Sequence, residues 1–191
     1  MDTIIKMDVD ALLWIQNNLR SEELTALMEK ITIFGEHGIF WIVICLSLMA
    51  FKKTRRIGII CSLSLALTFI CCNLLLKPIV DRLRPWEAYP VLKPLLDDPG
   101  DASFPSGHTA NAMGPAWALF LTGYDNKKAR IWGILAVILA FFIGFSRIYL
   151  GVHYPSDVIC ALILGVLCAS TVYYSYRRYE KTRGMDRQRI T

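Results

Sequence analysis

The chain has 191 residues, of which 54% are hydrophobic and 19% are charged, and its formal net charge is +5. This length suits one domain, or two at most. The composition excludes a disordered chain and argues against an ordinary soluble domain, which is about 45–50% apolar and about 25% charged. It therefore indicates a membrane protein.

The N-terminal region, residues 1–37, predicts two amphipathic helices, at 7–19 and 22–34. Apolar residues recur in both at helical spacing, as Val9, Leu12 and Leu13 do in the first. We expect these helices to lie in the membrane interface or to pack across the rest of the protein.

Five charge-free stretches follow, at 38–51, 57–76, 109–124, 131–146 and 158–176. A helix needs about 17–25 residues to cross the hydrocarbon core, so the second and fifth qualify alone, and the others need support from flanking residues. All five are apolar on every side. They predict an all-α fold, a polytopic transmembrane helical bundle with five spans.

The chain is expected to form a single integral-membrane domain over residues 1–191. The amphipathic helices occupy 1–37, the transmembrane catalytic core occupies 38–176, and a basic tail occupies 177–191.

Basic residues indicate the orientation, because cytoplasmic loops collect Lys and Arg. Clusters of them lie at 52–56, 127–130 and 177–183. Five alternating spans place all three clusters on one side, which we expect to be cytoplasmic. The protein is then a multi-pass protein of the cell membrane, and the loops at 77–104 and 147–156 face the extracytoplasmic side.

Three segments concentrate polar residues beside the predicted spans, where such residues are costly and usually functional. They lie at the end of the second span, at the start of the third, and at the junction of the fourth and fifth. The alternation brings all three to one membrane face. They are Lys77-x6-Arg84-Pro85, Pro105-Ser106-Gly107-His108 and Ser146-Arg147-x5-His153-x3-Asp157.

The cations of these segments, Lys77, Arg84 and Arg147, suit a phosphate group. Arg presents a planar fork that matches phosphate oxygens, and Lys adds a compact charge. Ser106 and Gly107 open a helix, whose N-terminus offers unpaired N–H groups to an anion. We expect these five residues to bind a dianionic phosphate and to stabilise its charge during transfer.

Two of the three histidines lie in the same segments. Asp157 follows His153 by four residues, so its carboxylate can reach Nδ1 and hold the tautomer whose Nε2 attacks. His108 is a candidate general acid for the leaving oxygen. The pattern predicts phosphoryl transfer through a phosphohistidine, which water then hydrolyses with His108 as the base. We expect no cofactor and no metal, because the cations neutralise the charge and the sequence lacks a carboxylate cluster for Mg²⁺.

The three segments resemble, without a departure, the signature of the type 2 phosphatidic acid phosphatase superfamily, which includes membrane lipid phosphatases and soluble vanadium haloperoxidases. The resemblance implies a helical bundle. It also implies His153 as nucleophile, Asp157 as its orienting partner, His108 as general acid, and the five residues named above as phosphate ligands. Members commonly have six transmembrane helices, so residues 22–34 are a candidate for a degenerate sixth span.

The apolar composition and the depth of the site favour a phosphorylated membrane lipid as the substrate. The expected partners are this lipid and the bilayer, not nucleic acid, and the oligomeric state is left open. For an outward-facing site, the resemblance implies first an undecaprenyl pyrophosphate phosphatase. The alternative is a phosphatidylglycerophosphate or phosphatidic acid phosphatase, which would carry the same motifs. A non-catalytic membrane module and a vanadate-dependent haloperoxidase are more distant alternatives.

Overall fold

The computed structural model describes residues 2–97, 100–123 and 127–190, and no strand occurs in these ranges. The predicted all-α fold is confirmed. Met1, Tyr124 and Thr191, which belong to predicted segments, lie outside the described residues. The elements in chain order are α1 (Asp2–Asn18), α2 (Glu22–Ile33), η1 (Glu36–Gly38), α3 (Ile39–Ala50), α4 (Arg55–Phe69), η2 (Ile70–Leu76), α5 (Lys77–Val80), α6 (Pro85–Ala88), α7 (Gly107–Thr122), α8 (Lys127–Tyr149) and α9 (Pro155–Ile190).

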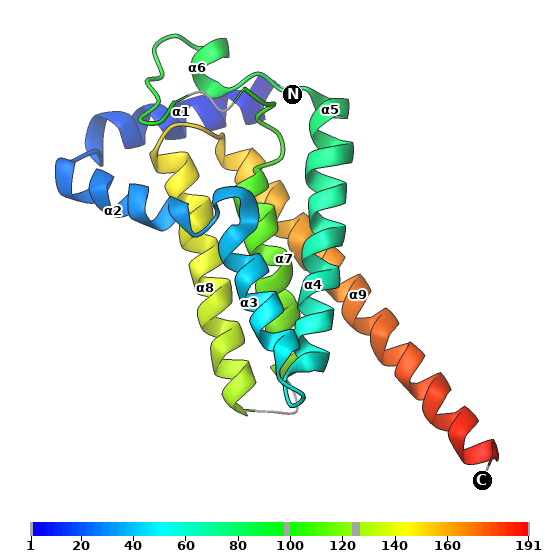
Figure 1. Cartoon of the computed structure of the whole chain (residues 1–191). Coiled ribbons are helices and arrows are strands. Elements are labelled where there is room, and N and C mark those ends of the chain that lie inside the picture. Colours follow the sequence, from blue (N-terminus) through cyan, green and yellow to red (C-terminus); the bar gives the residue numbers. More distant parts are fainter. Residues whose placement is uncertain (1, 98–99, 124–126, 191) are drawn as a thin grey trace.

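The five predicted spans correspond to a bundle made by α3, α4 with η2, α7, α8 and α9 (Figure 1). Three helical stretches are long and apolar enough to cross a membrane: Arg55–Ala88, Lys128–Tyr149 and Pro155–Gly184. Ile39–Ala50 is a shorter apolar helix. At about 1.5 Å per residue, the 16 residues of α7 extend about 24 Å.

Helix α7 is the central helix of the bundle and contacts α4, α8 and α9. Ten of its residues are buried, most of them small. Small residues let helix backbones approach closely, which is how helices pack in membranes, where apolar burial supplies little driving force. This packing fixes the height of the α7 N-terminus, which carries the second polar motif, relative to the neighbouring helices.

The helices α1 and α2 form a hairpin that lies across one end of the bundle (Figure 1). Ser21 caps α2 by accepting a hydrogen bond from the Leu24 backbone N–H at 3.2 Å. On their inner sides, Ile15 and Met28 are buried against the turn between α8 and α9. The 12 residues of α2 extend only about 18 Å, well short of a hydrocarbon core of about 30 Å. The amphipathic helices are thus present, and α2 packs across the bundle.

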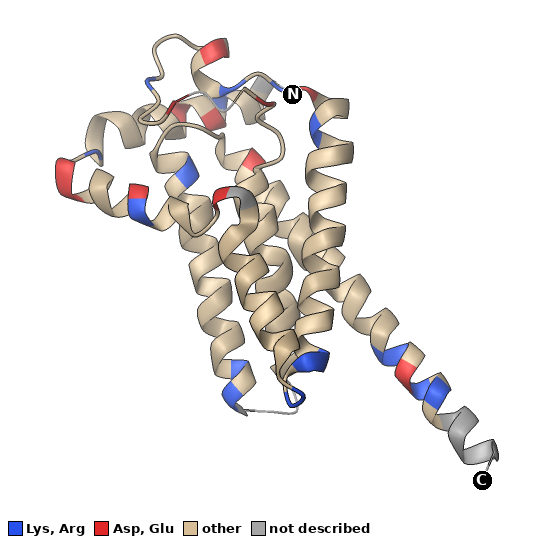
Figure 2. Ribbon diagram, viewed as in Figure 1, with Lys and Arg blue, Asp and Glu red and all other residues tan. Residues whose placement is uncertain are grey.

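The basic clusters lie at the other end of the bundle (Figure 2). The cluster 52–56 lies in the turn between α3 and α4 and in the first residues of α4. The beginning of α8 carries the cluster 127–130, in which the side chain of Lys127 lies outside the described part. Helix α9 continues beyond the bundle as one helix to Ile190, so the predicted tail at 177–191 is helical over its described length. The amphipathic hairpin and the three motifs occupy the opposite end.

The close contact between α7 and α9 gives a test of this packing. A Cβ atom added at Gly165 would lie 2.8 Å from Met113 Cβ and 2.9 Å from the Gly114 backbone nitrogen, whereas one added at Gly184 would meet nothing within 4 Å. We expect Gly165→Leu to destabilise the protein by about 1–3 kcal/mol through overpacking, and Gly184→Leu to have little effect. Thermal unfolding in detergent measures both, and equal midpoints for the two variants would contradict this packing.

Candidate active site

The first motif lies where the long helix of residues 55–80 ends. The π-helical turn η2 directly precedes Lys77, and such turns are frequent at functional sites. The helix stops at Asp81, which has a positive φ of 44°, a conformation that Asp adopts more readily than most residues. The chain then turns back over the bundle and places Arg84 directly before α6, where Pro85 takes the first helical position.

The cations Lys77 and Arg84 are buried, with 8% and 2% of their surfaces exposed. Both pair with one residue, Asp101: Lys77 Nζ donates to Oδ2 and Arg84 Nη2 donates to Oδ1. Arg84 also donates from Nε to the Asp101 carbonyl at 2.9 Å and from Nη1 to the Val152 carbonyl at 2.8 Å. The guanidinium plane of Arg84 is therefore held by three contacts.

The third cation, Arg147, lies in the last turn of α8 and is 4% exposed. Its Nη1 donates to Thr32 Oγ1 of α2 at 2.9 Å, and its carbonyl accepts from the backbone N–H of His153 at 3.3 Å. Its Nε is buried and has no hydrogen-bond partner among the described residues. Leaving a buried charged donor unpaired is costly, so this atom indicates a position for an anion.

His153 and Asp157 lie beside each other, as their spacing predicted. His153 Nδ1 lies 3.6 Å from Asp157 Oδ2, beyond hydrogen-bond distance, and 3.5 Å from Ser103 Oγ. The role of Asp157 as the orienting partner of His153 stays a prediction. His153 is fully buried, and burial lowers its pKa to about 4, although the neighbouring Asp157 acts to raise it. The imidazole is therefore neutral at physiological pH, which is the form that can act as a nucleophile.

The carboxylate of Asp157 is held from several sides. Ser103 Oγ donates to Oδ2 at 2.5 Å and the Tyr154 backbone N–H donates to the same oxygen at 3.0 Å. Arg82 Nη1 donates to Oδ1 at 2.6 Å, and its Nη2 donates to the buried Asp8 of α1 at 2.9 Å. An ionised carboxylate bound this way has a fixed orientation and stays available to orient His153.

The second motif begins α7. Ser106 is the N-cap residue, and its backbone N–H donates to the Asp157 carbonyl at 3.3 Å, which joins the α7 N-terminus to the first turn of α9. The Ser106 hydroxyl pairs with Thr109 Oγ1 at 2.9 Å. A Cβ atom at Gly107 would come within 2.8 Å of Asn73 Oδ1, so only glycine allows this approach. Its role as a phosphate ligand stays a prediction, as does that of Ser106.

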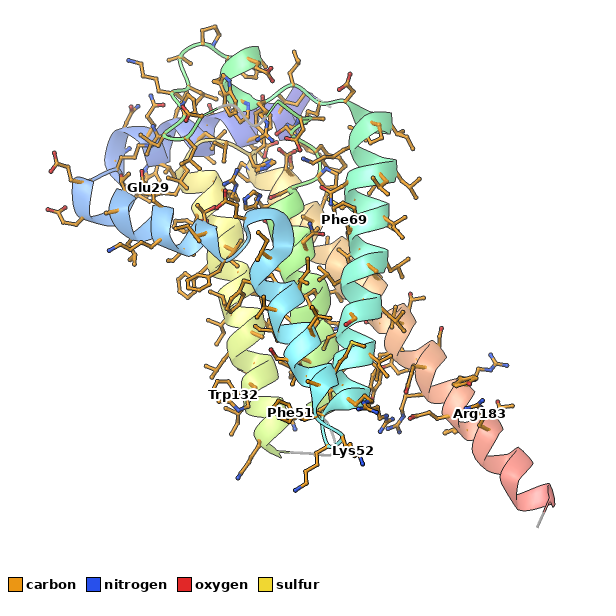
Figure 3. All side chains as sticks on the ribbon, in the orientation of Figure 1. Glu29, Phe51, Lys52, Phe69, Trp132 and Arg183 are labelled. Atoms are coloured by element: carbon orange, nitrogen blue, oxygen red, sulfur yellow. The ribbon has the colours of Figure 1, made fainter. Side chains whose placement is uncertain are left out.

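These elements enclose a cavity of about 240 Å³ at the motif end of the bundle. Figure 3 labels Phe69, which lines it from α4. Six of the eight predicted site residues also line it: Lys77, Arg84, Gly107, His108, Arg147 and His153. The other two, Ser106 and Asp157, are fully buried next to it. Both carboxylates of the site, Asp101 and Asp157, already pair with cationic side chains, so its chemistry suits an anion.

Four residues of the site were missed from the sequence: Asp8, Arg82, Asp101 and Ser103. Arg82 lies within the first motif and could have been noted as an additional cation. Asp8 gave no signal, because an acidic residue in an amphipathic helix is ordinarily placed on the exposed side. Asp101 and Ser103 lie in an irregular segment, whose contacts follow only from the tertiary structure.

Comparison with known proteins identifies the family of the chain. Residues 57–181 match the PAP2 superfamily. An undecaprenyl-diphosphatase of Sulfolobus acidocaldarius is 34% identical over 142 residues, which cover 74% of this chain and 66% of that protein. Phosphatidylglycerophosphatase B of Bacillus subtilis is 38% identical over 100 residues, covering 50% of this chain and 46% of that protein. The chain thus spans just under two thirds of the first and just under half of the second.

A solved structure extends the likeness to the fold. The crystal structure of a transmembrane PAP2 type phosphatidylglycerolphosphate phosphatase from Bacillus subtilis matches with a TM-score of 0.79 at 26% identity, covering 93% of this chain and 88% of that one. The family match at residues 57–181 contains all three motifs and covers more than half of the chain. The chain therefore belongs to the PAP2 superfamily, as its motifs predicted.

Proposed function

We propose that the protein is a membrane lipid phosphatase that works through a phosphohistidine intermediate. The observation that carries the proposal is the cavity in which three buried cations, one with an unpaired Nε, surround a neutral histidine. Lys77, Arg84 and Arg147 bind the phosphate oxygens, together with the N-terminus of α7 at Ser106 and Gly107.

The reaction proceeds in two displacements at phosphorus. His153 Nε2 attacks the terminal phosphorus and the P–N bond forms. The bond from this phosphorus to the oxygen that links it to the rest of the substrate breaks as His108 gives its proton to that oxygen, so the leaving group is the lipid phosphate from a pyrophosphate and the lipid alcohol from a phosphomonoester. Asp157 stabilises the charge on the imidazole through Nδ1–H. Water then attacks, His108 takes its proton, and the P–N bond breaks to release inorganic phosphate. The three cations neutralise the transferring group, so no step uses a metal.

As the substrate we propose undecaprenyl pyrophosphate, which would be converted to undecaprenyl phosphate. The relative from Sulfolobus acidocaldarius, which shares 142 aligned residues, supports this choice. The second candidate is phosphatidylglycerophosphate or phosphatidic acid, which the fold similarity to the Bacillus subtilis phosphatase supports. Both classes use the same motifs, so the lipid portion must decide between them.

We also propose that residues 1–191 form one domain in the cell membrane, with the catalytic core at 38–176 and the site on the extracytoplasmic side. The support is the separation of charges: the three basic clusters and the motif cations lie at opposite ends of the bundle. Because cytoplasmic loops collect basic residues, the end that carries the three clusters is the cytoplasmic one in this proposal, and the site lies at the other end.

Trapping the intermediate tests the mechanism. With an aryl phosphate labelled at phosphorus, whose leaving group needs little protonation, His108→Ala should accumulate acid-labile label on the protein. His153→Ala should show none and should lose turnover by about a thousandfold or more. Both reactions are run in EDTA, and gel filtration and thermal unfolding verify the fold. Wild-type turnover by His153→Ala, or a requirement for added Mg²⁺, would contradict the mechanism.

A substrate panel in detergent tests the choice of lipid. We expect kcat/KM to be highest for undecaprenyl pyrophosphate, compared with phosphatidylglycerophosphate and phosphatidic acid at equal mole fraction in the micelle. A higher value for either glycerolipid would replace the first proposal by the second. His153→Ala, assayed with each lipid, supplies the background.

Sidedness is measured with single cysteine substitutions at the two ends of the bundle. An impermeant thiol reagent should label Asp97→Cys in intact cells and Lys53→Cys only after lysis, because both positions are exposed but lie at opposite ends. The wild type, which has six cysteines, gives the background. The reverse pattern would place the active site in the cytoplasm.

A further inference from the structure

The carboxylate of Asp101 lies where we expect the phosphate group to bind, in contact with two cations of the site. Its two oxygens accept from two different phosphate-binding residues, Oδ2 from Lys77 and Oδ1 from Arg84. Burial alone would raise the pKa of Asp101, but these two cations hold it below the usual value. Asp101 also lines the 240 Å³ cavity together with His153. Its carboxylate therefore occupies two of the cationic donors that we expect to bind the phosphate oxygens.

The surroundings of Asp101 allow its carboxylate to leave while its backbone stays. Its side chain is 47% exposed, whereas those of Lys77 and Arg84 are 10% and 2% exposed. The Asp101 carbonyl is bound separately by Arg84 Nε at 2.9 Å, and two residues later the Ser103 backbone N–H donates to the Arg82 carbonyl at 2.8 Å. A rotation of the Asp101 side chain into water would free Lys77 Nζ and Arg84 Nη2 without moving the segment.

We propose that Asp101 is an internal counter-anion of the phosphate site, which the phosphate group of the substrate displaces and which returns when inorganic phosphate leaves. The inference rests on the proposed function for the identity of the displacing group. It makes Asp101 a determinant of affinity, not a group that reacts.

The exchange has two consequences. Lys77 and Arg84 stay paired at every stage, which avoids buried charges without a partner. Asp101 also competes with every anion that enters, so the apparent dissociation constant is the intrinsic one divided by the fraction of molecules in which the carboxylate is away. The same competition weakens the binding of inorganic phosphate after hydrolysis and favours its release.

Calorimetric titration of the detergent-solubilised full chain with inorganic phosphate and with orthovanadate tests this exchange without turnover. Ion pairs with a carboxylate that is partly exposed to water are weak, so Asp101→Asn should bind both anions more tightly by only about tenfold. The matched control is Asp97→Asn, which removes the same charge from an exposed position of the same loop and should stay within about twofold of wild type. Asp101→Glu, which keeps the negative charge, should bind both anions more weakly than Asp101→Asn does.

Unchanged or weaker anion binding by Asp101→Asn, with a thermal midpoint near that of wild type, would overturn the inference. If Asp101→Asn does not fold, Asp101→Ala supplies the same comparison. An equal gain from Asp97→Asn would also overturn it, because the effect would then be a general one of charge. A wild type that binds phosphate but hydrolyses no lipid of the panel would refute the proposed function and leave the role of Asp101 standing.

Discussion

The need to compensate positive charge at one end of an apolar bundle organises this structure. Lys77, Arg84 and Arg147 are nearly buried, and a buried cation without partners costs several kcal/mol. The bundle helices alone do not supply these partners. They come from the irregular chain above the bundle, which supplies the Asp101 carboxylate and the Val152 carbonyl, and from α2, which supplies the Thr32 hydroxyl. The loops and the N-terminal hairpin thus complete the electrostatics of the site as well as covering it.

Close helix packing fixes the surroundings of His153. The Ser106 backbone N–H binds the Asp157 carbonyl, so the beginning of α7 and the beginning of α9 are in register at the level of the site. Gly107 lies against Asn73, near the end of the helix that carries Lys77. Because the three motifs are joined through these short contacts, a shift of α7 by a fraction of an ångström would change the relation between the helix N-terminus, His153 and the cations.

Sequence reasoning succeeded where one physical rule decides the structure. Long apolar stretches predict helices that are buried or face lipid, and the alternation of these helices predicts that the three motifs lie at one end of the bundle. The i, i+4 relation of His153 and Asp157 was likewise predictable, since it is local at the beginning of a helix. The contacts of Asp101 and Arg82 were not, because they join residues 17 to 75 positions apart through segments without periodicity. The length of the helical tail was also missed, since a polar segment rich in Lys and Arg gives no signal of where a helix stops.

Some of the residues that support the site lie outside the region of the family match. The PAP2 match begins at residue 57, yet Thr32 of α2 binds Arg147, and Asp8 of α1 binds Arg82, which in turn holds Asp157. Residues of the first and third motifs are thus held, in this chain, by a hairpin that precedes the region of the family match. The same hairpin lies across the end of the bundle (Figure 1). Changes in α1 and α2 would therefore alter the support of Arg147 and, through Arg82, the support of Asp157.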